Sequence, residues 1–330
     1  MQKNAYRLII SVAMASTLIA CTSNEPSLSL HWKNWANTQA DSWLKNAAQL
    51  LEVNSNYCTG SAGIDSAQST FTQNLSQWAY INGYPYKAID EQALSFSLYF
   101  WPDKRNMTEI RLGARAETAE PLSSDAYDQL IAAEKGIPAI EWLLYKEDMT
   151  LAQRCSTLVA VSEVYLADVT ALYEYHQAAP VILDEWATDS EVIAGRSIAL
   201  NLLYAQISRL ESHLRQSRDD EGLWISYMAE GWRSENTWLV YSQSLTSLTE
   251  MLEHTGQTST ILPENKTRLE AYILDAKGVL AGFYKLTAHQ QNPEALDDLQ
   301  VLLVELANFL ENSLAENFGI LIGFNNFDGD

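Results

Sequence analysis

Basic residues are scarce in this chain. It has 21 Lys and Arg against 42 Asp and Glu, which gives a formal net charge of −21 at pH 7. Proteins that bind nucleic acid, or an anionic membrane surface through charge, need clustered lysine and arginine to neutralise phosphate. The charge balance therefore argues against both, and we expect no nucleic acid to bind. It is compatible with attracting cations and equally with a charge that only keeps the protein soluble.

Histidine and short catalytic signatures are sparse as well. The chain has no HExxH, P-loop, GxGxxG or GxSxG motif, and it lacks the carboxylate-plus-ExxH pattern of di-iron bundles. No two of its five histidines share a metal-ligand spacing; they are His31, His176, His213, His254 and His289. Glu250 and His254 are four apart, but they end a predicted helix, where a histidine meets the helix dipole favourably. We therefore expect capping there, not a metal site.

Cysteine is rare, with three in the chain. Cys21 belongs to the N-terminal targeting segment, so Cys58 and Cys155 remain for the fold. An oxidising compartment would permit a disulfide between them. However, Cys155 lies on an apolar helical stripe, where a free cysteine packs as a small hydrophobe. We predict two separate thiols.

The N-terminus has the pattern of a targeting segment. Lys3 and Arg7 precede an apolar run that is too short to span a bilayer comfortably. The run ends in Leu-Ile-Ala-Cys21, which resembles the bacterial lipoprotein signal, in which the cysteine becomes the lipidated first residue. This predicts a signal peptide over 1–20, lipidation of Cys21 and a tether over 21–31. The alternative is a plain secretory signal with an incidental cysteine.

The same resemblance predicts where the protein resides. Thr22 follows the lipidated cysteine, and by similarity to Gram-negative lipoprotein sorting this implies the outer membrane. We therefore expect a periplasmic protein that reaches the membrane through its lipid anchor.

Hydrophobic periodicity predicts an all-α fold. The clearest helix covers 149–176, and a second long pattern runs through 193–214. Weaker helical patterns cover 32–51, 71–79, 234–254, 265–288 and 294–317. Residues 54–66 are expected to form a turn-rich break, and 93–103 an extended segment. A boundary near 180–190 divides the chain into similar halves. Most tryptophans and tyrosines fall on helical stripes, which favours core packing over a glycan-binding face.

One stretch stands out, EKGIPAIEWLLY at 134–145. Pro138 lacks an N–H and disfavours helical geometry at Ile137, yet proline suits the start of a helix. We predict a break at Gly136-Ile137 and a new helix from Pro138. Glu141 then lies near the positive end of that helix, which is one adequate explanation for it. Because the following WLLY is apolar all round, Glu141 is also a candidate for a buried, paired carboxylate at a functional site.

The same stretch carries a family resemblance. Gly136-Ile137-Pro138-Ala139-Ile140-Glu141 resembles the G-x-H-x-x-E signature of imelysin-like proteins, with proline in place of histidine. That family is named for a bacterial insulin-cleaving metallopeptidase. Three further segments are similar to family motifs and follow in the same order: FWPDK at 100–104, Arg233-Ser234-Glu235, and GFNNFDGD at 323–330.

The resemblance implies two packed helical-bundle domains, 32–185 and 186–330, with a pocket at their interface that the G-x-H-x-x-E helix lines. Its members are typically periplasmic or lipid-anchored, and many are linked to iron uptake or regulation. The candidate pocket residues carried over to this sequence are Gly136, Pro138, Glu141, Trp101, Arg233, Ser234 and Glu235.

Proline at position 138 changes what the motif can do. Histidine and glutamate three apart on a helix could hold a metal or form an acid–base pair. A catalytic Zn²⁺ usually takes three protein ligands, so we expect no metal at Glu141 alone and assign no catalytic residue. The cofactor is unknown. Glu141 is expected to meet a cation, either a bound ligand or Arg233, whereas Ser234 is expected mainly to cap the helix through Trp238.

The sequence thus predicts a non-catalytic, lipid-anchored periplasmic protein of the imelysin-like type. It would bind a small ligand, a peptide or an envelope protein at the interface pocket, in iron uptake or regulation. A metallopeptidase with an altered metal site is the first alternative. A structural or interaction protein of the cell envelope is the second.

Overall fold

The computed structural model describes residues 28–82, 94–118, 120–123, 127, 129–178, 191–219, 221–254, 261–283 and 293–320. The predicted signal peptide, the lipidation site at Cys21 and the closing motif at 323–330 lie outside these residues. Within the described ranges every regular element is a helix, apart from one isolated bridge between Arg218 and Trp224. The predicted all-α class is confirmed.

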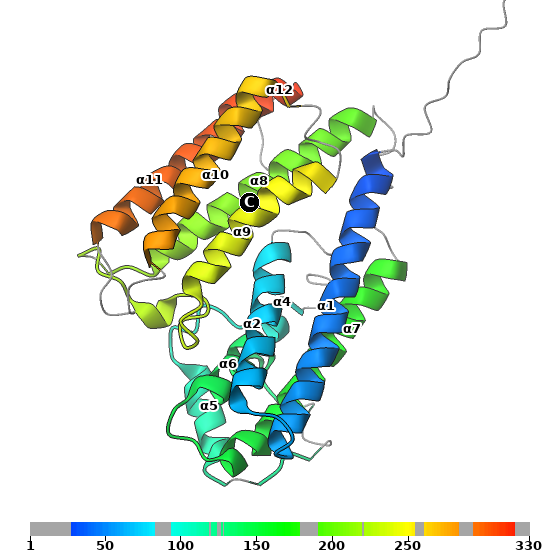
Figure 1. Ribbon diagram of the computed structural model, residues 1–330, viewed down its shortest axis with the longest axis vertical. Coiled ribbons are helices and arrows are strands. Elements are labelled where there is room, and N and C mark those ends of the chain that lie inside the picture. Colours follow the sequence, from blue (N-terminus) through cyan, green and yellow to red (C-terminus); the bar gives the residue numbers. More distant parts are fainter. Residues whose placement is uncertain are drawn as a thin grey trace, which may run out of the picture.

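The helices of the first half form one group, in the lower part of Figure 1. α1 packs against α2 and α7, and the short helix α6 packs against the same two helices. The elements are α1 (Leu28–Cys58), α2 (Ile64–Ile81), α4 (Leu94–Leu98), α5 (Met107–Ala116), η2 (Ala132–Glu134), α6 (Gly136–Tyr145) and α7 (Leu151–Ala178).

The helices of the second half form the upper group in Figure 1. α8 packs against α9 and α11, and α10 packs against the same two helices. The elements are α8 (Glu191–Gln216), η3 (Ser226–Met228), α9 (Thr237–His254), α10 (Pro263–Phe283), α11 (Pro293–Phe309), the π-helical turn η5 (Leu310–Leu314) and α12 (Ala315–Phe318). Residues 179–190 lie outside the described ranges, so the domain boundary between 185 and 186 stays a prediction.

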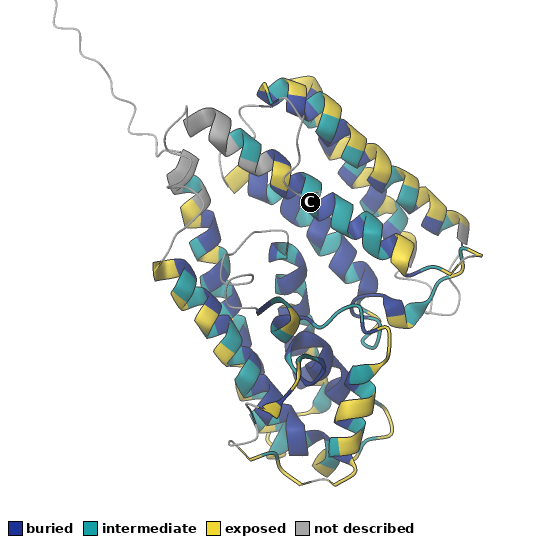
Figure 2. Ribbon diagram, turned by 180° about the vertical axis from the view of Figure 1, so that it is seen from behind, coloured by how far each residue is buried: buried dark blue, intermediate teal, exposed yellow. Residues whose placement is uncertain are grey.

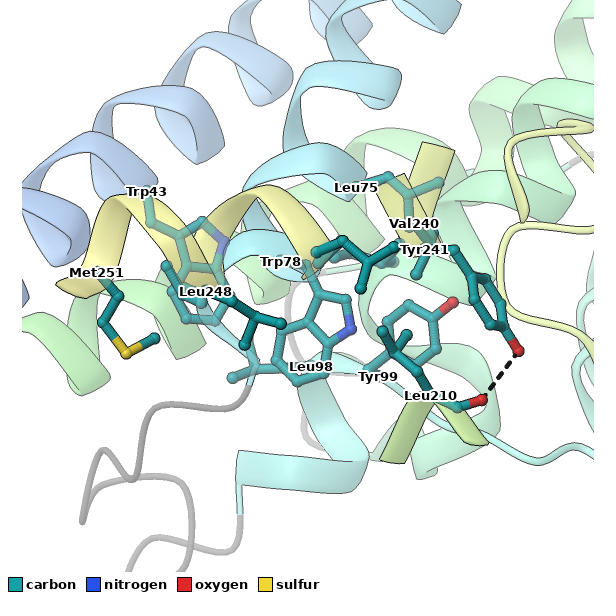
Figure 3. Close-up of a cluster of buried hydrophobic side chains, with 14 of the residues drawn as sticks. Trp43, Leu75, Trp78, Leu98, Tyr99, Leu210, Val240, Tyr241, Leu248 and Met251 are labelled. Atoms are coloured by element: carbon teal, nitrogen blue, oxygen red, sulfur yellow. Dashed lines mark hydrogen bonds between the residues drawn. The ribbon is translucent and has the colours of Figure 1, made fainter. Parts of the chain in front are cut away.

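A single hydrophobic core runs through both groups of helices. Trp78 of α2 stacks on Tyr99, with ring centroids 5.2 Å apart and an interplanar angle of 5°. Figure 3 shows these rings beside Tyr241 of α9, whose hydroxyl donates to the carbonyl of Leu210 in α8 at 3.3 Å. Exposed residues lie mainly on the outer faces of the helices (Figure 2). Because buried apolar area is the main favourable term in folding, separating the halves would expose this shared core to water.

Two predicted boundaries differ from the structure. α1 begins at Leu28, inside the predicted tether at 21–31, and continues to Cys58, into the break predicted at 54–66. Asn54 is fully buried there, and its side-chain amide donates to Ser162 Oγ of α7 at 2.9 Å. This tertiary contact outweighs the preference of asparagine for turns. Likewise, α4 occupies part of the segment predicted to be extended, and only 99–103 lack helical structure.

The prediction of two separate thiols was wrong. Cys58 and Cys155 form a disulfide, with Cα atoms 5.5 Å apart and a sequence separation of 97. α1 and α7 run antiparallel, so the last residue of α1 meets the first turns of α7. An apolar stripe shows which face of a helix is buried, but it does not show which residue of another helix lies opposite.

α7 is the one helix in the described part of the chain that is long and apolar enough, by composition, to cross a membrane. Half of its most apolar window is buried inside the protein. Its buried Ser162 bonds to Asn54, and Trp43 donates to the hydroxyl of its Tyr165 at 2.7 Å. These contacts are typical of a core helix, whose apolar face covers other helices.

Candidate functional site

The start of α6 depends on a glycine. Gly136 has φ +68°, in the left-handed region, and a Cβ there would lie 2.2 Å from the carbonyl oxygen of Leu98. Glycine is the residue that tolerates both the conformation and the contact. The predicted break is confirmed at Gly136, whose φ is not helical, but not at Ile137: the helix begins at Gly136 instead of Pro138 and includes Ile137. Pro138 falls in the first turn, where a missing N–H leaves no intrahelical bond unmade.

Glu141 is the buried carboxylate of this helix, with 2% of its surface exposed. The backbone N–H and the hydroxyl of Ser234 both donate to its Oε1, at 3.0 and 2.6 Å. Arg233 Nη1 lies 4.0 Å from Oε2. Burial raises the pKa of Glu141, and the charge of Arg233 and the bonds from Ser234 oppose that rise. The carboxylate thus holds a loop of the second half against α6, and the predicted pairing with Arg233 is confirmed.

The prediction that Ser234 caps a helix was wrong. α9 begins at Thr237, and Ser234 Oγ donates to Glu141 Oε1 while it lies 3.1 Å from the carbonyl oxygen of Gly231. Glu235 has φ +57°, so the chain turns sharply between Ser234 and the helix. This turn directs Ser234 toward α6 and leaves Glu235 exposed.

Arg233 lies at the edge of a hollow. Its guanidinium carbon stacks 4.6 Å from the ring centroid of Trp232, and its Nη2 donates to Asn106 Oδ1 at 3.4 Å. The hollow has a volume of about 290 Å³ and lies between the end of α6, α5 and the loop at 232–233. It is lined by Glu109, Trp142, Tyr145, Lys146, Glu147, Asp148, Trp232 and Arg233. Residues from both halves of the chain therefore form its wall.

Of the predicted pocket residues, Arg233 lines this hollow, whereas Gly136, Pro138, Glu141, Trp101, Ser234 and Glu235 do not. Trp101 lies elsewhere. Its ring lies against His213 of α8, with centroids 3.8 Å apart. Two residues later, the carboxylate of Asp103 accepts the backbone N–H groups of Met107 and Thr108, at 2.7 and 2.8 Å, and so caps α5. The FWPDK segment therefore anchors α5 and contacts the second half.

His213 belongs to a buried polar cluster that the sequence did not reveal. Glu230 Oε2 lies 2.9 Å from His213 Nδ1 and 2.8 Å from Arg209 Nη1. Burial alone would raise the pKa of Glu230, but the Arg209 charge and the His213 contact outweigh it and lower the pKa to about 2. Arg209 also donates to Ser244 Oγ, which donates to the carbonyl of Ala79 in α2, both at 2.9 Å. The cluster therefore links the two halves, as Glu141 does.

Comparison with known proteins identifies the family. The family model described as Imelysin (peptidase M75) matches residues 36–287. The chain belongs to the imelysin family. The crystal structure of an imelysin-like protein from Psychrobacter arcticum 273-4, at 2.15 Å resolution, aligns with a TM-score of 0.72 and 14% sequence identity. The alignment covers 90% of this chain and 98% of that one, and at this identity it establishes the fold. The search of curated proteins found no match.

The imelysin signature of this chain does not fit a catalytic metal. Pro138 stands where the signature has histidine and offers no ring nitrogen, and both oxygens of Glu141 face groups of the protein, Ser234 and Arg233. Within the described ranges, no three His, Cys, Asp or Glu side chains group closely enough to hold a metal ion. A catalytic zinc usually needs three protein ligands and an open position, and this site presents one engaged carboxylate.

Proposed function

We propose that this imelysin-family protein is a non-catalytic, lipid-anchored periplasmic protein that binds a ligand or partner at the hollow beside α6. The observation that carries the proposal is the state of Glu141. A catalytic carboxylate must be free to meet substrate, water or metal. Here the carboxylate accepts two bonds from Ser234 and lies beside Arg233, so its role is to hold the wall of the hollow in place.

The lining of the hollow supports binding. Trp142, Tyr145 and Trp232 provide aromatic surface, and Lys146 and Arg233 provide positive charge beside three acidic residues. Ligand sites are typically concave and rich in aromatic residues, with a few polar groups that fix orientation. A volume of about 290 Å³ suits a small molecule or the side chains of a short peptide. The suggested link to iron uptake or regulation rests on the family resemblance.

Two features of the chain support the periplasmic location. The disulfide between Cys58 and Cys155 is typical of an oxidising compartment. The N-terminal segment resembles a lipoprotein signal that ends at Cys21. A Cys21→Ser variant expressed in a Gram-negative host is expected to leave the membrane fraction, whereas the parent chain stays in it.

The experiment that tests binding is calorimetry of the purified chain against iron salts, haem, siderophores and short peptides. One class is expected to bind, and Trp232→Ala is expected to weaken its affinity about tenfold or more by removing aromatic surface and the support of Arg233. Tyr227→Ala is the matched control, because Tyr227 is an exposed aromatic residue outside the hollow. Failure of every ligand, or equal effects of the two variants, would contradict the proposal.

The alternative function is peptide hydrolysis, which the name of the family suggests. It predicts cleavage of a denatured protein substrate that chelators abolish and added Zn²⁺ restores. Such cleavage, lost in Glu141→Ala, would replace the binding proposal with a metallopeptidase.

A further inference from the structure

A second and larger concavity lies away from the imelysin signature. Its volume is about 490 Å³, and it lies between α2 and α9, with Gln39 of α1 at its edge. None of the residues that line it belongs to the hollow beside α6. We refer to it as the α2–α9 groove.

Two polar stripes form its walls. The α2 stripe recurs at helical spacing and therefore lies on one face; it comprises Thr72, Gln73, Ser76, Gln77 and Tyr80. The α9 stripe comprises Leu239, Gln243, Glu250 and His254. The two helices run alongside each other, since Asn236 Nδ2 donates to Thr72 Oγ1 at 3.4 Å and Tyr80 donates to Glu250 Oε2 at 2.8 Å.

The chemistry of the groove is that of neutral hydrogen bonding. Four glutamines line it, and each amide carries both a donor and an acceptor. Ser76, Thr72 and Tyr80 add hydroxyls, and the lining contains one carboxylate, Glu250, and no lysine or arginine. An anionic ligand would therefore meet no lysine or arginine on these walls, in a protein whose net charge is already −21.

Glu250 is the one carboxylate in the lining of the groove. Burial lowers the pKa of Lys277 on α10, and the nearby Glu250 carboxylate opposes that shift. Tyr80 fixes the orientation of the carboxylate by donating to its Oε2. The groove therefore presents one oriented carboxylate acceptor among amides and hydroxyls.

We infer that the α2–α9 groove binds a short neutral saccharide. Sugar hydroxyls both donate and accept, so they match amide and hydroxyl walls and a fixed carboxylate better than any other neutral ligand does. Tyr80 lines the groove with its hydroxyl bonded to Glu250, so the carboxylate acceptor is held in a fixed position beside the amides. A peptide usually anchors through apolar side chains, and Leu239 is the one aliphatic residue in the lining. The α2 stripe spans roughly 12 Å, from the eight steps between Thr72 and Tyr80 at the helical rise, and this length suits an oligosaccharide better than a single ring.

The test begins with the full chain on an array of defined neutral oligosaccharides, followed by calorimetry with the tightest one. The variant is Gln73→Ala/Gln243→Ala; neither side chain makes a hydrogen bond with other described residues, and both are at least partly exposed. Removing both amides is expected to weaken saccharide affinity about tenfold or more. The control Gln177→Ala/Gln216→Ala removes two exposed glutamines outside the groove and is expected to leave affinity unchanged.

Hydrogen exchange provides a readout that does not depend on the variants. Bound saccharide is expected to slow exchange in 72–80 and 243–254 and to leave the loop at 232–233 unchanged. Trp232→Ala alters the hollow and not the groove, and is expected to keep saccharide affinity. Saccharide binding at the groove and ligand binding at the hollow are therefore tested independently. Four results would overturn the inference: no saccharide binding at millimolar concentration, equal losses in both double variants, protection elsewhere, or binding of neutral peptides in place of sugars.

Discussion

Ser234 donates two hydrogen bonds to a single oxygen of Glu141, 93 residues earlier in the chain, and thereby joins the second half of the protein to α6. The carboxylate of the imelysin signature therefore accepts hydrogen bonds within the protein and helps to hold the fold together. Arg233, beside Ser234, places its guanidinium between that carboxylate and the hollow. The motif residue that could have been catalytic therefore shapes the wall of a candidate binding site.

Removing the Glu141 side chain should destabilise the fold. Glu141→Ala leaves the hydroxyl and N–H of Ser234 without their acceptor and Arg233 without its counter-charge, and we expect a loss of about 2–4 kcal/mol in the free energy of unfolding. Glu141→Gln keeps an acceptor oxygen and should lose about half of that. Urea unfolding measures both, with the exposed Glu235→Ala as control. If Glu141→Ala and Glu235→Ala have equal effects, the contact contributes nothing.

Gly136 should tolerate no side chain. Gly136→Ala would place a Cβ 2.2 Å from a backbone oxygen at φ +68°, and we expect a loss of about 3 kcal/mol or more. Gly278→Ala, in the interior of α10 with no atom within 4 Å of the new Cβ, should instead stabilise the protein by up to about 1 kcal/mol. Thermal unfolding distinguishes the two. A neutral Gly136→Ala would show that α6 can begin in another way.

Reduction of the Cys58–Cys155 disulfide should weaken the fold. The bond closes a long loop, with a sequence separation of 97, and the chain-entropy model gives a loss of about 4–5 kcal/mol for a loop of that length. Urea unfolding with and without reductant measures it, and Cys58→Ser/Cys155→Ser should behave as the reduced protein does. An unchanged midpoint after complete reduction would contradict the structure.

Two of the buried carboxylates, Glu230 and Glu141, should depend on pH in opposite ways. Glu230 has its pKa lowered from 4.5 to about 2, so its contribution is present above pH 4.5 and is lost as the pH falls toward 2. The loss is on the order of 3 kcal/mol. The pKa of Glu141 is raised, so proton binding to this carboxyl favours the folded state below pH 4.5. This contribution to the free energy of unfolding is lost as the pH rises through the raised pKa.

Unfolding free energies of the parent, Glu230→Gln and Glu141→Gln at pH 3 and pH 6 test this difference. In Glu230→Gln, the decrease in the free energy of unfolding from pH 6 to pH 3 should be smaller than in the parent chain. In Glu141→Gln, this decrease should remain. Equal acid profiles for the parent and Glu230→Gln would contradict the assignment to Glu230.

Local features of the sequence were enough to predict most helices. Apolar periodicity placed α7 and α8 within a few residues, and Gly136 with Pro138 marked the start of α6, because these signals depend on neighbours in the chain. A buried carboxylate needs a partner, so the sequence predicted that Glu141 would meet a cation, either a bound ligand or Arg233, and the structure places Arg233 beside it.

Relationships between distant residues were harder to predict. Whether Cys155 meets Cys58 depends on the antiparallel packing of α1 on α7, and whether Ser234 caps a helix or bonds to Glu141 depends on the turn at Glu235. The cluster of Arg209, His213 and Glu230 assembles from two elements whose spacing carries no motif. Each of these contacts is fixed by tertiary packing, which outweighs local preference.

The most direct test of the account is the metal content of the purified protein, measured by mass spectrometry after equilibration with Zn²⁺ or Fe²⁺ and removal of excess. We predict that the parent chain and Glu141→Ala hold the same amount of metal, with no equivalent bound at α6, because Pro138 offers no ligand and Ser234 engages the carboxylate. One equivalent of metal in the parent chain that Glu141→Ala removes would contradict it.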